Sequence, residues 1–293
     1  MVFAQRFAPR RAWSASRLES YRDCPFRFFV ASVLKLEARA QPSEGLDAAQ
    51  LGNLYHRILE EVYQAVVDPT DLAQLLDALP AVAGPILDKA PRQEQFRPTA
   101  WWAQTRIEIV ENVRRSLVAL DAVREDFVPW GYEARFGLGD QSPLIVYDGD
   151  DSFRVHGLID RVDRAPGGRV RIIDYKTGGP TPFRNNNVVK GKKLQLPLYA
   201  LAAQEALGLG TVSDGFYWHV RNAEASPFTL AKFVVKEESL FGPDGAMQIA
   251  VRHAWEAVRG ARQGHFVPVT PDEKCPAYCP AAAFCWQYQA KAR

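Results

Sequence analysis

The stretch SFRVHGLIDRVDRAPGGRVRIIDYKT, residues 152–177, decides the fold. Two β-prone runs in it flank Pro166-Gly167-Gly168, which is typical of a hairpin turn. The pattern therefore predicts two neighbouring antiparallel strands. Pairing of this kind brings Asp160 of the first strand close to Asp174 of the second.

Asp174 and Lys176 are two positions apart on the second strand, so both side chains leave the same face. Two close carboxylates repel unless a cation lies between them, and a few hard oxygen ligands suit Mg²⁺ or Mn²⁺. Such an ion activates water and neutralises charge on a phosphodiester, while Lys176 holds the water or the phosphate. The pattern indicates a metal-dependent phosphodiesterase, although a lone Asp-x-Lys is more often a cross-strand salt bridge.

Outward from this hairpin, the chain predicts an α/β protein. Residues 46–67 carry apolar side chains at helical spacing, and His56 lies beside that stripe. Ser16 and Glu19 predict a capping box at the start of an N-terminal helix, and the prolines of 71–125 are expected to break its helices. The other expected segments are a linker at 38–45, strands at 130–137, 152–164, 169–177, 212–220 and 228–235, and helices at 196–207 and 237–262.

The composition narrows the classes of partner. The 293 residues carry 36 Lys and Arg against 34 Asp and Glu, a formal charge of +2, so nucleic-acid binding requires local basic patches. No apolar run approaches the roughly 18 residues of a membrane span, and residues 1–11 lead into no signal-peptide core. We expect a cytoplasmic protein with no membrane contact. Gly191-Lys192 lacks the rest of a phosphate-binding P-loop, so ATP hydrolysis by that route is not expected.

The four cysteines are too few for a disulfide scaffold, and in a reducing compartment they suggest metal ligation. Cys275, Cys279 and Cys285 lie close together in the tail, and Cys24 lies near the N-terminus. Four thiolates match a Cys₄ centre. Because the ligands come from both ends of the chain, such a centre would clip the N-terminal helix to the tail. Zinc and four unligated thiols are alternative interpretations.

The segment 178–193 is rich in basic residues and contains no acidic one. Its basic residues are Arg184, Lys190, Lys192 and Lys193. We expect a flexible loop that follows a nucleic-acid backbone, with a merely solvated loop as the alternative.

Gln195 and Tyr199 stand four positions apart at the start of the following helix, so both side chains lie on one helix face. Because a helix N-terminus attracts anions, we expect these two residues to hold the phosphate or base next to the cut. Buried packing is the alternative for Tyr199.

The ordered motifs of the chain resemble the RecB-like branch of the PD-(D/E)xK nucleases, and most closely the AddB-type nuclease domain and its CRISPR-associated exonuclease relatives. The motifs that carry the resemblance are Ser14-Ala15-Ser16-Arg17-Leu18 to Cys24-Pro25, Gly52 to His56, Gly157-x-x-Asp160-Arg161, Asp174-Tyr175-Lys176-Thr177-Gly178, Gln195-x-x-x-Tyr199 and the cysteine tail. The resemblance implies a restriction-endonuclease-like α/β core, a mixed β-sheet flanked by helices. It also implies one domain over 1–293, with a helical insertion at 68–126 and a cluster-binding region formed by 275–285 and Cys24.

The resemblance also implies roles for individual residues. His56, Asp160, Asp174 and the Tyr175 carbonyl become metal ligands, and Lys176 becomes the catalytic lysine. An imidazole ligand should favour Mn²⁺ over Mg²⁺. The four cysteines are implied to hold a structural 4Fe-4S cluster.

Two further residues are weighed beside these ligands. His156, four residues before Asp160, is a lower-ranked rival to His56. Glu133 falls where many relatives carry an acidic residue, with a solvated carboxylate as the alternative.

The expected function is metal-dependent hydrolysis of DNA, exonucleolytic on single strands, in recombination, repair or end processing, with a helicase as partner. One rival is a catalytically silent nuclease fold that binds DNA or serves as a scaffold. Such a fold would normally have lost Asp160, Asp174 or Lys176, and all three are present. A second rival is an iron–sulfur or zinc interaction protein.

Overall fold

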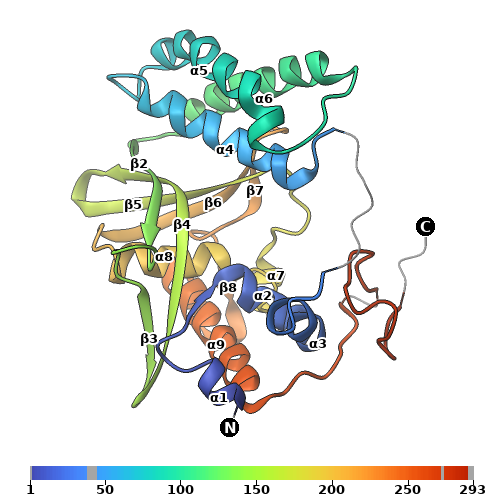
Figure 1. Ribbon diagram of the computed structural model, residues 1–293. Helices are drawn as coiled ribbons and strands as arrows, with labels where there is room; N and C mark the ends of the chain where they lie inside the picture. The colour runs from blue at the N-terminus through green and yellow to red at the C-terminus, as the bar shows by residue number, and fades with distance from the viewer. Residues whose placement is uncertain (1, 38–44, 272–273, 290–293) are drawn as a thin grey trace.

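A computed structural model describes residues 2–37, 45–271 and 274–289, and it places a central β-sheet between two helical layers (Figure 1). The sheet has seven strands in the order β1-β4-β5-β6-β7, with β2 and β3 also paired to β4. Their bounds are β1 Ala12–Ser14, β2 Val128–Phe136, β3 Leu144–Asp148, β4 Asp151–Ala165, β5 Arg169–Lys176, β6 Thr211–His219 and β7 Glu224–Thr229. A separate two-stranded sheet pairs β8 (Val234–Val235) with β9 (Leu240–Phe241). Apart from Gly45, the expected linker at 38–45 lies outside the described residues.

The pairing confirms the predicted mixed sheet. Strand β4 runs antiparallel to β5 across the Pro166-Gly167-Gly168 turn, and β5 runs parallel to β6. Strands β1 and β3 are not among the predicted strands, and the single strand expected at 228–235 is divided between β7 and β8. The long β4 is therefore the strand that joins the two halves of the sheet.

Helices cover both faces of the sheet (Figure 1). Helices α4, α5 and α6 pack against one face through Ile173 and Trp218, while α8 and α9 pack against the other through Val170 and Ile172. The helix bounds are α1 Val2–Arg6, α2 Ala15–Asp23, α3 Pro25–Phe28, α4 Ala48–Gln64, α5 Leu72–Gln93, α6 Trp102–Ala122, α7 Asn185–Val189, α8 Gln195–Glu205 and α9 Gly242–Gln263. No helix in the described ranges is both long and apolar enough to cross a bilayer.

The expected helix breaks in 71–125 are wrong for three of the four prolines. Helix α5 runs through Pro80, Pro85 and Pro91. A proline in a helix interior costs about 3 kcal/mol, but the buried face of α5 packs between α4 and α6 and outweighs that cost. The buried residues are Leu75, Leu79, Ala83, Ile86, Leu87 and Ala90.

Two predicted helix starts are also wrong. Helix α2 is capped by Ser14, whose Oγ accepts the Arg17 N–H, rather than by Ser16. Glu19 is not part of a capping box because it reaches another helix, described below. Helix α9 begins at Gly242 rather than at 237, since β8, a short 3₁₀ turn and β9 occupy the preceding residues.

The C-terminal tail packs against the N-terminal helices. Val30 of the π-helical turn Phe29–Val33 contacts Cys279 and Ala281 in a small apolar cluster. Figure 1 shows the red tail lying beside the blue α3. Segments more than 200 residues apart in sequence are thus neighbours, as the proposed clip requires.

Candidate functional site

The site lies where β4 and β5 separate. The pairing of these strands ends with Arg161 opposite Ile173, so the next residues, Asp160 and Asp174, lie across from each other. Beyond that point the Tyr175 N–H donates to Asp160 Oδ2 at 2.7 Å. A side-chain carboxylate thus takes the place of a backbone acceptor.

Helix α4 brings His56 to this fork. A capping box between Asp47 and Gln50 starts the helix, and its apolar stripe packs against the sheet, which leaves His56 at the edge of the stripe facing the strands. The imidazole Nε2 lies 3.0 Å from the Tyr175 carbonyl oxygen, and Nδ1 lies 3.4 Å from Asp160 Oδ1. The structure therefore brings three of the predicted ligands together.

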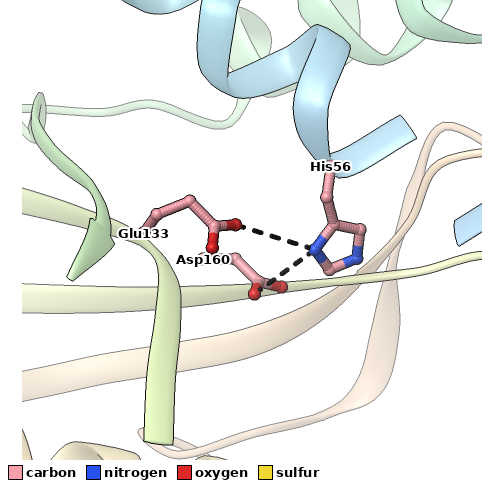
Figure 2. Close-up of side chains that lie close together, drawn as sticks. All are labelled: His56, Glu133 and Asp160. Carbon is pink, nitrogen blue, oxygen red and sulfur yellow. Dashed lines mark ion pairs between the residues drawn. The ribbon is translucent and has the colours of Figure 1, made fainter. Parts of the chain in front are cut away.

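Glu133 of β2 completes the group in place of Asp174. One ligand atom each from His56, Glu133 and Asp160 lies within 4.8 Å of the other two, and the His56 Nδ1 to Glu133 Oε1 distance is 4.0 Å (Figure 2). Glu133 has a φ of 49°, a left-handed conformation that is costly for a side chain in a strand. This conformation re-aims the carboxylate, and no sequence signal other than its acidic character points to it.

Asp174 lies beside that group and is oriented by a lysine. Its side chain is 1% exposed and forms an ion pair with Lys176 Nζ, while Oδ1 has no hydrogen-bond partner among the described residues. Lys176 Nζ also donates to Gln195 Oε1 at 3.0 Å. A buried carboxylate oxygen with an unused lone pair suits a divalent cation.

Mutual repulsion shifts the titration of these acids. Burial and the charge of Asp160 raise the pKa of Glu133 to about 7. Burial raises the pKa of Asp174 to about 6, with Asp160 adding to the rise and Lys176 opposing it. Burial lowers the pKa of His56, but Asp160 and Asp174 outweigh that effect and raise it to about 9. Three acids held so close fit a centre that a cation would neutralise.

The start of α8 is held by Glu19 of α2. Glu19 Oε1 accepts the N–H groups of Leu194 at 2.7 Å and Gln195 at 3.0 Å. These are unsatisfied donors at a helix start, and a carboxylate is favoured there. Glu19 therefore fixes the Gln195 side chain that contacts Lys176.

Tyr199 is mostly packed in the protein interior. Its side chain is buried, and its ring meets Phe136 edge-on at 5.4 Å between centroids. Burial and the charge of Asp174 raise the pKa of Tyr199 above its usual value. Its predicted contact with substrate therefore stays a prediction, and the alternative of buried packing describes its ring.

The basic segment 178–193 is not the simple flexible loop that its composition predicts, because α7 forms within it. Arg184 and Lys190 are exposed at the two ends of α7, and Lys192 is half-buried. Lys193 Nζ lies 3.7 Å from Glu19 Oε2. The two exposed residues remain the better candidates for contact with nucleic acid.

His156 lies apart from the His56 group. It faces Ser14 of β1, and burial together with the charge of Arg17 lowers its pKa. The structure thus places the rival histidine beside a cation rather than beside the acids.

All four cysteines line one pocket between α3 and the tail. Cys24 Sγ accepts the N–H groups of Arg27 at 3.4 Å and Val269 at 3.5 Å. Among the described residues, no three of the four sulfurs lie within 4.8 Å of one another. A tetrahedral zinc ion with Zn–S bonds near 2.3 Å needs sulfurs about 3.8 Å apart, so this arrangement is not a preformed zinc site.

A cleft of about 490 Å³ opens beside the His56 group. His56 and Glu133 line one side of it, and Glu60 and Glu61 of α4 line another. The metal-binding atoms are therefore reachable from solvent. Acidic side chains around the opening favour the entry of cations.

A family model and curated proteins match this chain. The model of the PD-(D/E)XK nuclease superfamily matches residues 12–286, and the chain belongs to that superfamily. Members use divalent metal ions, which agrees with the donor group described above.

Curated proteins that are each named as one component of an ATP-dependent helicase/deoxyribonuclease are similar to this chain. The one from Caldanaerobacter subterraneus subsp. tengcongensis is 31% identical over 249 residues, which are 78% of this chain and 20% of the relative. The one from Moorella thermoacetica is 32% identical over 228 residues, 71% of this chain and 19% of the relative. The one from Pelotomaculum thermopropionicum is 35% identical over 210 residues, 67% of this chain and 18% of the relative. The chain spans about a fifth of the length of these relatives.

Proposed function

We propose that the protein is a divalent-metal-dependent deoxyribonuclease that degrades single-stranded DNA from an end. The observation that carries the proposal is the group of His56, Glu133 and Asp160, whose ligand atoms lie within 4.8 Å of one another beside the Asp174–Lys176 pair. Superfamily membership supports hydrolysis of phosphodiesters, and the names of the relatives support DNA as the substrate. The preference for single strands and for ends is the finer part of the proposal.

In this proposal His56, Asp160 and Asp174 hold Mg²⁺ or Mn²⁺, with the Tyr175 carbonyl at its edge and Glu133 as an additional ligand. When bound, the ion supplies Lewis-acid stabilisation of the phosphodiester and a water of lowered pKa.

The protein's own residues then act on the substrate. Lys176, positioned by Gln195, donates hydrogen bonds to the attacked phosphate or to the water. The exposed Arg184 and Lys190 bind the strand beyond the cut.

A helicase is the proposed partner of the nuclease. The relatives are named as components of a helicase/deoxyribonuclease, and the chain corresponds to about a fifth of their length. A helicase that separates duplex DNA would supply the single strands that the nuclease cuts. Recombination and repair are the processes that need such end processing.

The four cysteines are proposed to hold a 4Fe-4S cluster, with zinc as the alternative. Their shared pocket supports a common ligand, and the wide sulfur spacing favours a cluster larger than one zinc ion. Protein purified without oxygen should be brown with broad visible absorption. A colourless, zinc-loaded sample would reject the cluster.

The nuclease proposal is tested with Asp174→Asn on end-labelled single strands in Mn²⁺ or Mg²⁺. We expect a loss of at least about 10³-fold in cleavage rate, since metal-dependent stabilisation of charge dominates such reactions. Asp77→Asn, which removes an exposed carboxylate on α5, is the matched control and should cleave as the wild type does. Equal cleavage by Asp174→Asn would reject the site, and absence of cleavage by the wild type would support a silent DNA-binding module. Comparing 5′ and 3′ labels gives the polarity.

A further inference from the structure

A second cavity, of about 430 Å³, lies at the N-terminal end of the chain. We call it the N-terminal basic cavity because it is lined by Arg6, Arg11, Arg17 and Lys35. Its floor is apolar and consists of the buried rings of Phe7 and Trp13, and no acidic residue lines it. Its volume is within the range of ligand-binding pockets.

Two of its cations are held in place. Arg6 Nη2 donates to the Val33 carbonyl oxygen at 2.9 Å. The Arg17 guanidinium lies 5.2 Å from the centre of the Trp13 ring, which is a cation–π contact. Such preorganised guanidinium groups lose little side-chain entropy when an anion binds.

The positive charge of the cavity is uncompensated within the described ranges 2–37, 45–271 and 274–289. None of its four cations forms an ion pair with a carboxylate in those ranges, whereas many other surface arginines do. The charge is concentrated enough that burial and Arg6 together lower the pKa of Arg17. Like charges gathered around one cavity destabilise it unless an anion binds between them.

The N-terminal basic cavity connects to the candidate active site along one strand. Strand β1, which carries Trp13 into the cavity, places Ser14 opposite His156 of β4. His156 and Asp160 have the same strand parity and are separated by about 13 Å of extended chain, from a rise of about 3.3 Å per residue. A nucleic-acid strand that enters the active site is therefore within a few nucleotides of the cavity.

We propose that the N-terminal basic cavity binds backbone phosphates of the nucleic-acid strand that is cut at the His56 group. The proposal rests on the nuclease function and assigns that function a second contact with its substrate. Four cations exceed the charge of one phosphate, so the cavity matches a stretch of backbone better than a free phosphate ion. Its contacts carry no base information, so it binds strands of any sequence.

The test uses the double variant Arg11→Gln/Lys35→Gln, since both side chains are exposed and neither contributes to the core. Binding of a fluorescent single strand is measured by anisotropy in EDTA over a range of salt concentrations. Loss of two phosphate contacts should reduce the slope of log affinity against log salt by about 1.4 and weaken binding at least about tenfold at low salt. The matched control Lys89→Gln/Arg92→Gln removes two exposed cations from α5 and should leave the slope unchanged.

Each outcome decides the proposal. A wild-type slope in Arg11→Gln/Lys35→Gln overturns it. So does an unchanged slope together with thermal stabilisation by inorganic phosphate that the double variant lacks, because the cavity then binds the free ion.

The nuclease function can fail separately. If the slope falls but the wild type cuts no strand in Mn²⁺, the nuclease proposal fails and the binding site stands. If the wild type cuts and the slope is unchanged, the reverse holds.

Discussion

Replacing Asp174 by asparagine should stabilise the metal-free protein at alkaline pH while it abolishes cleavage. The carboxylate is 1% exposed, and burial raises its pKa from 3.8 to about 6 despite the ion pair with Lys176. A rise of that size corresponds to about 3 kcal/mol by which the fold opposes ionisation of Asp174. Asparagine has nearly the same shape and never ionises, so it avoids this penalty.

The sign of the effect follows from proton binding. A carboxyl group whose pKa is higher in the folded than in the unfolded protein binds more protons when folded. Its contribution to stability is present below pH 3.8 and is lost as the pH rises through about 6. We therefore expect Asp174→Asn to match the wild type near pH 4 and to exceed its free energy of unfolding by about 1–3 kcal/mol at pH 8.

Urea unfolding in EDTA at pH 4, 6 and 8 measures this difference, with Asp77→Asn as the control. Addition of Mn²⁺ should reverse the order, because a metal at 100 times its Kd stabilises the wild type by about 2.7 kcal/mol and the variant by much less. A variant that is less stable than the wild type at pH 8 without metal would refute the reasoning. Asp174 would then be a stabilising ion-pair partner rather than a carboxylate held in place for a cation.

Three further outcomes are expected. Lys176→Met should lower the cleavage rate about 10²–10³-fold while calorimetric titration shows Mn²⁺ affinity unchanged or higher, because a cation beside the acids is lost; weaker metal binding would contradict this role. Glu19→Ala should lower the free energy of unfolding by about 1–3 kcal/mol and reduce cleavage, whereas Glu19→Gln, which keeps the acceptor for the α8 N–H groups, should retain most of both; equal effects of the two changes would argue against capping. Cys24→Ser should abolish visible absorption and lower the Tm although serine preserves the helix cap at this position, so an unchanged spectrum would show that the thiol is not a ligand.

Local patterns are sufficient for the centre of the fold. The turn at Pro166-Gly167-Gly168 and the alternation on either side predict the hairpin, and the register then places Asp160 across from Asp174. The helix that carries His56 follows from its apolar spacing and is found at Ala48–Gln64. These features depend on neighbours in sequence, which is why the sequence reveals them.

Features that depend on distant partners escape a reading of local sequence. Glu133 reaches the site because β2 pairs with β4 on the side away from β5 and because its own φ is positive, and neither fact is written in local sequence. The spacing of Glu19 predicts a cap for its own helix, yet it caps one 175 residues away. Pro80 and Pro85 signal a break locally, but tertiary packing of α5 overrides that signal.

Tyr175 explains why the site forms at the fork between β4 and β5. In a strand, the N–H and C=O of one residue point to the same side, and those of Tyr175 point toward β4 beyond the end of its pairing. Buried backbone groups left unpaired there would cost free energy, so Asp160 accepts the N–H and His56 approaches the C=O. The buried tyrosine ring anchors this peptide in the core of the α4–α6 layer. The same separation of the strands that leaves the Tyr175 peptide without backbone partners thus draws a carboxylate, an imidazole and a carbonyl to one point, where a cation can bind all three.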